Sequence, residues 1–92
     1  MKTIEAACQY FEINEDELLD ENRKKGVISK ARHFIMWYHY MVMNQSYAES
    51  ARSIFMDRHS ASYAVRKLNS KLNEDSKLSI EMDNFIALIE TT

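Results

Sequence analysis

Apolar residues recur every three or four positions through most of the chain, which is the spacing of an amphipathic α-helix. The pattern predicts helices over 4–11, 15–19, 28–44, 46–56 and 60–74, and a last one from Ser79 to near the end of the chain. The segment 28–44 is the longest and is rich in aromatic residues, so we expect it to be the central, mostly buried helix.

Polar residues that cap helices stand in front of several of these segments. Asn14 with Glu17, and Ser46 with Glu49, have the spacing of a capping box. Thr3 and Ser60 are single candidate caps for the helices that follow them. The caps strengthen the helical prediction and set where each helix should begin.

Composition supports an all-α fold. The 92 residues include no proline and one glycine, Gly26, which leaves few of the turns that β-rich folds need. We therefore predict one all-α domain of five or six helices spanning residues 1–92. Met1 and the absence of a tag favour a complete short protein over an excised domain.

Several functional classes have no support in the sequence. Cys8 is the only cysteine, so a disulfide framework is excluded, and His33 and His39 lie six positions apart, a spacing that does not suit a metal site on one helix face. The apolar run 34–43 is too short to span a bilayer, and the acidic N-terminus does not resemble a signal peptide. We expect a cytoplasmic protein without cofactor, metal, membrane or small-molecule substrate, and not an enzyme.

Charge is distributed unevenly along the chain, although the formal net charge is only −2. Residues 1–21 carry one lysine and seven acids, and residues 72–92 carry one lysine and five acids. Residues 22–71 between them carry ten Lys or Arg and two acids, a local charge of +8. A basic segment of this kind is typical of proteins that neutralise phosphates of nucleic acids.

The predicted helices 46–56 and 60–74 are joined by a short turn, as in a helix-turn-helix, whose second helix enters the DNA major groove. The turn lacks the glycine often found there, so the spacing alone leaves this interpretation open.

An ordered series of short segments resembles the C-terminal DNA-binding domain of the bacterial replication initiator DnaA, a Trp-repressor-like domain. In chain order they are Phe11-Glu12-Ile13, Leu18-Leu19, Arg23-Lys24-Lys25, Lys30-Ala31-Arg32, Ser46-Tyr47-Ala48-Glu49, Asp57-Arg58-His59-Ser60-Ala61 and Ala64-Val65-Arg66-Lys67-Leu68. The resemblance covers nearly the whole chain. It implies a stand-alone, sequence-specific double-stranded DNA-binding protein, similar to an origin-box-binding domain, that regulates replication or transcription by occupying a site, in a phage, a mobile element or a host cell.

The chain departs from the family where the base-reading residues lie. The family's Arg-Asp-His reads Asp57-Arg58-His59 here, and the segment before Arg66 is about one residue short. Ala61 replaces a threonine, and Ser50 occupies a position that is usually apolar. The family's ATPase module is absent, since the chain has no phosphate-binding GxxxxGK[ST] motif. The fold therefore carries over better than the sequence specificity.

The resemblance implies three groups of DNA-contacting residues. A minor-groove loop would comprise Arg23, Lys24 and Lys25, and the start of the long helix would bring Lys30 and Arg32 to phosphates. The recognition helix would offer Arg58, His59, Ser60 and Ala61 to bases and Arg66 and Lys67 to phosphates, with Arg52 and Asp57 as weaker candidates. Other replication or regulatory proteins are further candidate partners. The alternative is a helical protein-interaction module that has lost base reading, which the acidic ends and the altered turn favour.

Overall fold

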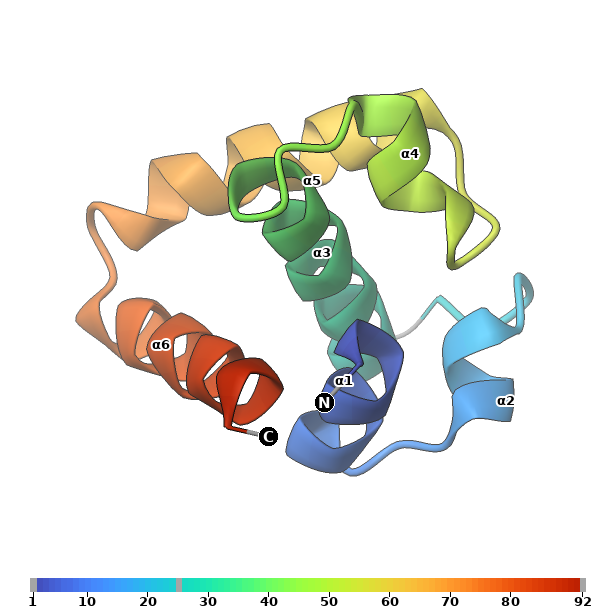
Figure 1. The fold of residues 1–92 in the computed structure, drawn as a ribbon, viewed down its shortest axis with the longest axis horizontal. Helices are drawn as coiled ribbons and strands as arrows, with labels where there is room; N and C mark the ends of the chain where they lie inside the picture. Colours follow the sequence, from blue (N-terminus) through green and yellow to red (C-terminus); the bar gives the residue numbers. More distant parts are fainter. Residues whose placement is uncertain (1, 25, 92) are drawn as a thin grey trace.

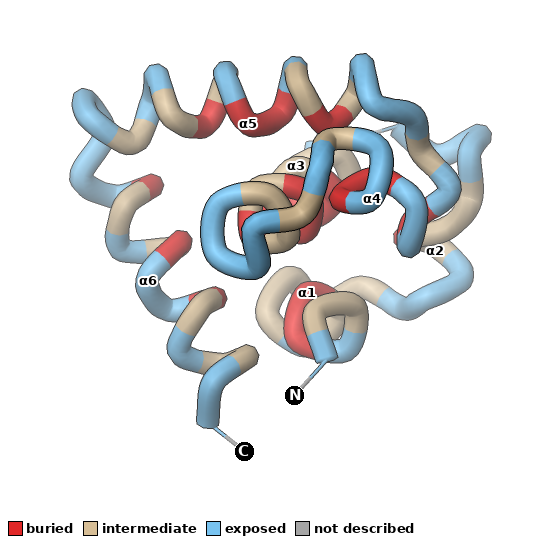
Figure 2. The backbone as a smooth tube through the Cα atoms, turned by 45° about the horizontal axis from the view of Figure 1, so that its top comes forward, coloured by how far each residue is buried: buried red, intermediate tan, exposed pale blue. Residues whose placement is uncertain are grey.

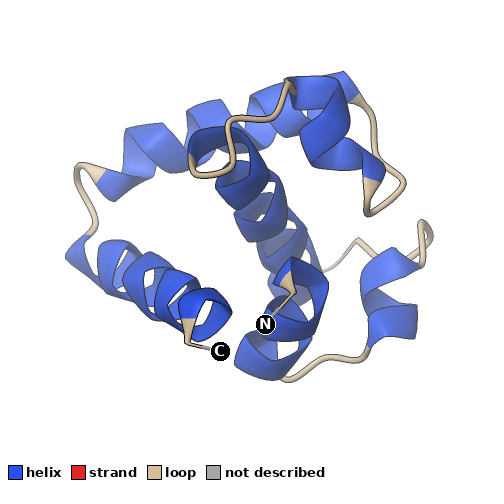
Figure 3. Ribbon diagram, viewed as in Figure 1, coloured by secondary structure: helices blue, strands red, loops and turns tan. Residues whose placement is uncertain are grey.

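The computed structural model describes residues 2–24 and 26–91. Across these ranges the chain forms six helices and no strand, and 74% of it is helical (Figure 3). The helices are α1 (Thr3–Phe11), α2 (Glu15–Leu19), α3 (Gly26–Met41), α4 (Tyr47–Arg52), α5 (Arg58–Leu72) and α6 (Ser76–Glu90). The prediction of an all-α domain with five or six helices is confirmed.

Helix α3 is the centre of the molecule, as the aromatic content of its segment predicts. It contacts α1, α2, α4 and α5 (Figure 1). Phe34, Ile35 and Met36 in its middle are fully buried. α5 crosses one end of α3, and α4 lies against both helices (Figure 1). The three helices pack together, and α5 contacts the other two through one side of the helix only.

An aromatic cluster holds the other end of the molecule together. The ring of Phe85 on α6 lies 5.6 Å from that of Phe34 on α3, and Phe11 on α1 lies 5.2 Å from Phe34. All of these ring pairs meet edge to face or tilted, the geometry that aromatic pairs prefer. α6 therefore closes the core over α1 and α3 even though it comes last in the chain.

Two of the predicted caps are confirmed, two are wrong, and four helices begin earlier than predicted. Asn14 and Ser46 each complete a capping box with the glutamate three residues later. Thr3 does not cap α1, because it is already the first residue of that helix, and Lys2 stands at the N-cap position without a side-chain cap hydrogen bond. α3 begins at Gly26 instead of residue 28. Ser60 does not cap α5, because the carboxylate of Asp57 already accepts from the backbone N–H of Ser60 and α5 begins at Arg58. Asp75 caps α6 in the same way, which places its start at Ser76 instead of the predicted Ser79.

The turn between α4 and α5 is longer than predicted, because α4 ends at Arg52 rather than near residue 56. The N–H of Met56 donates to the carbonyl of Ala51 and that of Phe55 to the carbonyl of Arg52, which is the pattern of a Schellman motif. Phe55 takes the left-handed position of this motif at φ 57°, where glycine is usual. Local hydrogen bonding thus builds the tight turn without a glycine.

α3 begins two residues earlier and ends three residues earlier than the predicted 28–44. The N–H of Met43 donates to the carbonyl of Tyr38, and Asn44 adopts a left-handed φ of 57°, so the helix ends at Met41. None of the helices in the described ranges combines the length and apolar character needed to cross a membrane.

Candidate nucleic-acid interface

α5 presents one apolar side to the protein and one polar side to solvent. Its buried residues recur about once per turn along the helix (Figure 2), and they are Ala61, Ala64, Val65 and Leu68. The exposed side includes Arg58, His59, Tyr63, Arg66, Ser70 and Lys71. No acidic residue occurs between Arg58 and Leu72, while four Lys or Arg do. This surface is the candidate interface.

The first turn of α5 holds the predicted base-reading residues in two different environments. Arg58 and His59 are exposed and Ser60 is half-buried, so these three side chains face or border solvent. Ala61 is 0% exposed, because it packs on the side of α5 that faces the core. The expected methyl contact from Ala61 to a base is therefore wrong for this structure.

Asp57 acts as the N-cap of α5. Its Oδ1 accepts a hydrogen bond of 2.9 Å from the backbone N of Ser60, and the hydrogen bonds from Ser60 hold the pKa of the Asp57 carboxyl below its usual value. The carboxylate stays ionised and occupied at the helix N-terminus, where the helix dipole also favours it. A contact from Asp57 to a base would compete with this cap.

Arg66 and Lys67 both lie on the solvent side of α5. Arg66 is exposed, and its Nε donates to the carbonyl of Ser62 at 3.3 Å. Nζ of Lys67 lies 5.5 Å from the centre of the Tyr63 ring. Neither cation is paired with a carboxylate in the described part of the chain.

The basic loop is only partly as expected. Arg23 pairs with two acids of the α2 region, at 3.7 Å from Glu17 and 3.5 Å from Asp20. Lys24 is exposed. Lys25 lies outside the described residues. Of the two described cations in the loop, Arg23 forms ion pairs and Lys24 does not.

Arg32 is a correction to the predicted site. It is 6% exposed, and its guanidinium donates to the carbonyls of Leu18, Asp20 and Arg23 at 2.6–2.8 Å. These carbonyls belong to the end of α2 and the loop that follows, where helical acceptors have no partner within the helix. Arg32 therefore fixes α2 and the basic loop onto α3, and its charge is not presented to a phosphate.

Lys30 is likewise engaged within the protein. Its Nζ lies 2.8 Å from Oε2 and 2.9 Å from Oε1 of Glu81 on α6. Because both side chains remain one-third or more exposed, a phosphate could compete for the ammonium only by displacing this carboxylate. Lys30 thus links α3 to α6.

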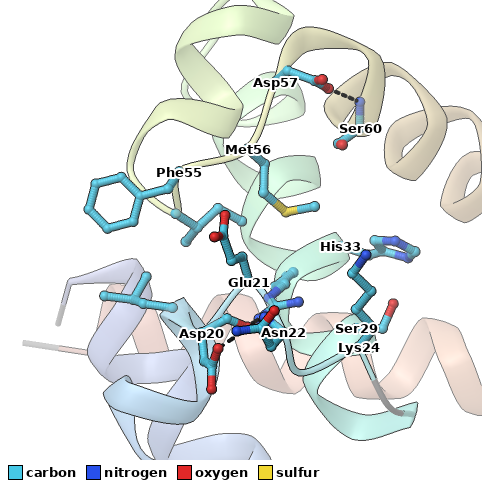
Figure 4. A pocket seen from close by; sticks show the side chains of 13 residues that line it. Asp20, Glu21, Asn22, Lys24, Ser29, His33, Phe55, Met56, Asp57 and Ser60 are labelled. Carbon is cyan, nitrogen blue, oxygen red and sulfur yellow. Dashed lines mark hydrogen bonds between the residues drawn. The ribbon is translucent and has the colours of Figure 1, made fainter.

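A groove of about 1180 Å³ joins the basic loop to the start of α5. Lys24, Ser29 and His33 lie on one side of it and Met56, Asp57 and Ser60 on the other (Figure 4). The basic loop and the start of α5, two of the three predicted groups, therefore border one surface. Asp20 and Glu21 also line the groove, which makes its charge mixed.

His33 lies at the contact between α3 and α5. Its ring meets the ring of Tyr63 edge to face at 5.9 Å. Burial, followed by the positive charges of Lys67 and Lys71, lowers the pKa of His33. The neutral imidazole is the form that this basic surface favours.

Other chemistry-bearing residues have structural partners. The ring nitrogens of His39 lie 2.9 Å from Oε1 of Gln45 and 3.1 Å from Oγ1 of Thr3. Burial raises the pKa of the Cys8 thiol, and the negative charges of Glu15 and Glu17 raise it further. The reactive thiolate is therefore disfavoured. Across the described ranges no three His, Cys, Asp or Glu side chains gather closely enough to hold a metal ion.

Tyr63 and Lys71 belong to the exposed surface of α5 and were missed from sequence. Tyr63 follows His59 by four positions and precedes Arg66 by three, so helical periodicity places it on the same side as both. That periodicity is the signal in the sequence that places Tyr63 on this side of the helix.

Comparison of the chain with protein-family models, curated proteins and solved structures found no match.

Proposed function

We propose that this protein binds double-stranded DNA with α5 in the major groove, and regulates replication or transcription by occupying its site. The observation that carries the proposal is the solvent side of α5, which is basic, free of acids and backed by the short helix α4 across a tight turn. The ordered resemblance to the DnaA C-terminal domain supports the same interpretation.

Five cations are placed to contact DNA in this proposal, Arg58 at a base edge and the other four at phosphates. They are Lys24, Arg58, Arg66, Lys67 and Lys71, and each is exposed or half-buried without an ion pair to a carboxylate in the described structure. Contacts to phosphate position a protein on the duplex, and contacts to base edges give it specificity. In α5 the exposed Arg58 and His59 are the candidates for base contacts, since the N-terminal residues of a recognition helix reach the bases.

The test is a fluorescence anisotropy titration against random duplex DNA at several salt concentrations. Four neutralised phosphates correspond to a slope of log affinity on log salt of roughly −3 to −4. Replacing Arg66 and Lys67 together by Gln should weaken binding on every sequence and flatten the slope by about two. The control is Lys77→Gln, which removes an exposed cation from α6 and should leave the slope unchanged. Absence of salt-sensitive binding by the parent at low ionic strength would exclude the proposal.

The second candidate is a helical protein-interaction module, favoured by apolar side chains that the fold leaves in solvent. Phe55 is 80% exposed beside the groove, and Met41, Val42 and Met43 form a run at the end of α3 that is 39–48% exposed. Neither feature is needed to bind DNA. Two results together would favour this candidate. The parent protein would not bind duplex DNA, and Phe55→Ser or Met43→Ser would change self-association measured by sedimentation.

A further inference from the structure

Tyr63 stands in the middle of the exposed stripe of α5. His59, Tyr63, Arg66 and Ser70 are all exposed and follow one another at spacings of four, three and four. Tyr63 is 54% exposed, whereas Tyr38 in the core is 6% exposed. A large aromatic side chain is thus displayed between a candidate base-reading histidine and a candidate phosphate-binding arginine.

The ring of Tyr63 is held from the protein side. Nζ of Lys67 lies 5.5 Å from the ring centre, and the His33 ring on α3 meets it edge to face at 5.9 Å. The Tyr63 hydroxyl makes no hydrogen bond in the described part of the chain, whereas that of Tyr38 lies 3.4 Å from Oε2 of Glu90. The ring is therefore positioned while its polar end is left free for another molecule.

We infer that Tyr63 is a specificity-determining residue that contacts a base edge in the major groove. The inference rests on the proposed function. Tyr63 lies one helical turn, about 6 Å, beyond His59, so it follows the same groove a further one or two base pairs. Its hydroxyl can donate to or accept from base edges, and its ring can pack against a thymine methyl.

Tyr63 differs from its neighbours in one measurable respect, because it carries no charge. A residue that binds phosphate contributes to the salt dependence of binding, and a neutral residue that reads a base does not. Loss of Tyr63 should therefore change sequence preference without changing the salt slope. A residue that only supports the fold of α5 would change neither the preference nor the slope.

The experiment selects duplexes from a random-sequence pool with the parent, Tyr63→Phe and Tyr63→Ala, and then measures salt slopes on the duplex preferred by the parent. At one base-pair position we expect the preference of the parent to fall by roughly tenfold in Tyr63→Ala, the discrimination of one good base contact. Loss in both variants assigns the contact to the hydroxyl, and loss in Tyr63→Ala alone assigns it to the ring. Both results support the inference.

The matched control is Tyr10→Phe, which removes the same hydroxyl from a half-buried residue of α1. It should keep the preference of the parent, and circular dichroism should show the same helicity for all variants. An unchanged preference in Tyr63→Ala, or a flattened salt slope, would overturn the inference while DNA binding itself stands. A parent that binds no duplex overturns the proposed function and this inference together.

Discussion

Phe55 occupies a position where its backbone and its side chain are both unfavourable. Its φ of 57° lies in the left-handed region that costs a residue with a Cβ about 1–2 kcal/mol. Its ring is 80% exposed, so packing against the protein offsets little of that cost. The Schellman hydrogen bonds around it nevertheless hold the turn that separates α4 from α5.

Phe55→Gly should therefore stabilise the protein. Relief of the left-handed strain, less the extra freedom that glycine gives the unfolded chain, leaves a gain of about 0.5–1 kcal/mol in the free energy of unfolding. Urea denaturation followed by circular dichroism measures it. Ser53→Gly is the control, because Ser53 has a helical φ of −64° and glycine there should destabilise. A Phe55→Gly protein less stable than the parent would show that the ring stabilises the turn.

At the scale of elements, the contact between α3 and α5 combines packing with repulsion between like charges. α5 packs through small residues, with Ala61 and Ala64 both 0% exposed, which lets the two helices approach closely. The same approach brings His33 of α3 near Lys67 and Lys71 of α5. Protonation of His33 would add a third positive charge to this contact.

Acidification from pH 7 to pH 5 should consequently lower the free energy of unfolding, because His33 becomes protonated. Because its pKa is lowered from 6.5 on folding, the unfolded chain binds more protons over the interval between the two values. Stability is fully present above pH 6.5 and decreases as the pH falls through the lowered value. Thermal unfolding at half-unit pH steps should give a shallower decline for His33→Gln than for the parent.

Lys67→Gln provides the matched comparison for this pH dependence. It removes one of the charges that lower the pKa of His33, so its decline should lie between those of the parent and His33→Gln. Equal declines in the parent and in His33→Gln would show that another group controls stability in this range.

At the scale of the molecule, α6 packs against the first helix, α1, and against the central helix, α3. Phe85 is 0% exposed, and its ring lies within 6.4 Å of those of Tyr10, Phe11, Phe34 and Tyr38. Lys30 of α3 and Glu81 of α6 add an ion pair across 51 positions of sequence. The last helix is therefore part of the same core as α1 and α3.

Phe85→Ala should destabilise the whole protein by about 3–5 kcal/mol, the usual cost of removing a buried phenylalanine. The total stability of a domain is on the order of 5–15 kcal/mol, so this loss should lower the melting temperature, and all six helices should unfold in one transition. Differential scanning calorimetry measures the change. Ile80→Ala, at a residue of α6 that is 59% exposed, should change stability by less than about 0.5 kcal/mol. Separate melting of α6 in Phe85→Ala, with the remainder unaffected, would contradict this account.

Sequence alone determined the features that depend on residues close together in the chain. Asn14 with Glu17 and Ser46 with Glu49 cap their helices as predicted, because a capping box spans only three residues. The six helical segments followed from apolar periodicity, which is also a local pattern, and the central helix from the length and aromatic content of its segment. The start of α5 was misplaced because Asp57 and Ser60 were both able to cap, and local spacing did not choose between them.

Tertiary structure decided which of the cations face solvent. Arg32 looked like a surface charge in the sequence, yet it binds the carbonyls of Leu18 and Asp20, which lie 14 and 12 positions earlier. Lys30 is paired with Glu81, and the ring of Tyr63 meets His33 of α3. A charge is exposed or engaged according to what packing brings beside it, and packing joins residues far apart in the chain. The charge pattern therefore located the basic segment. Only the packing of α2, α3 and α6 showed that Arg23, Lys30 and Arg32 are engaged within the protein, whereas the cations of α5 have no ion pair in the described part of the chain.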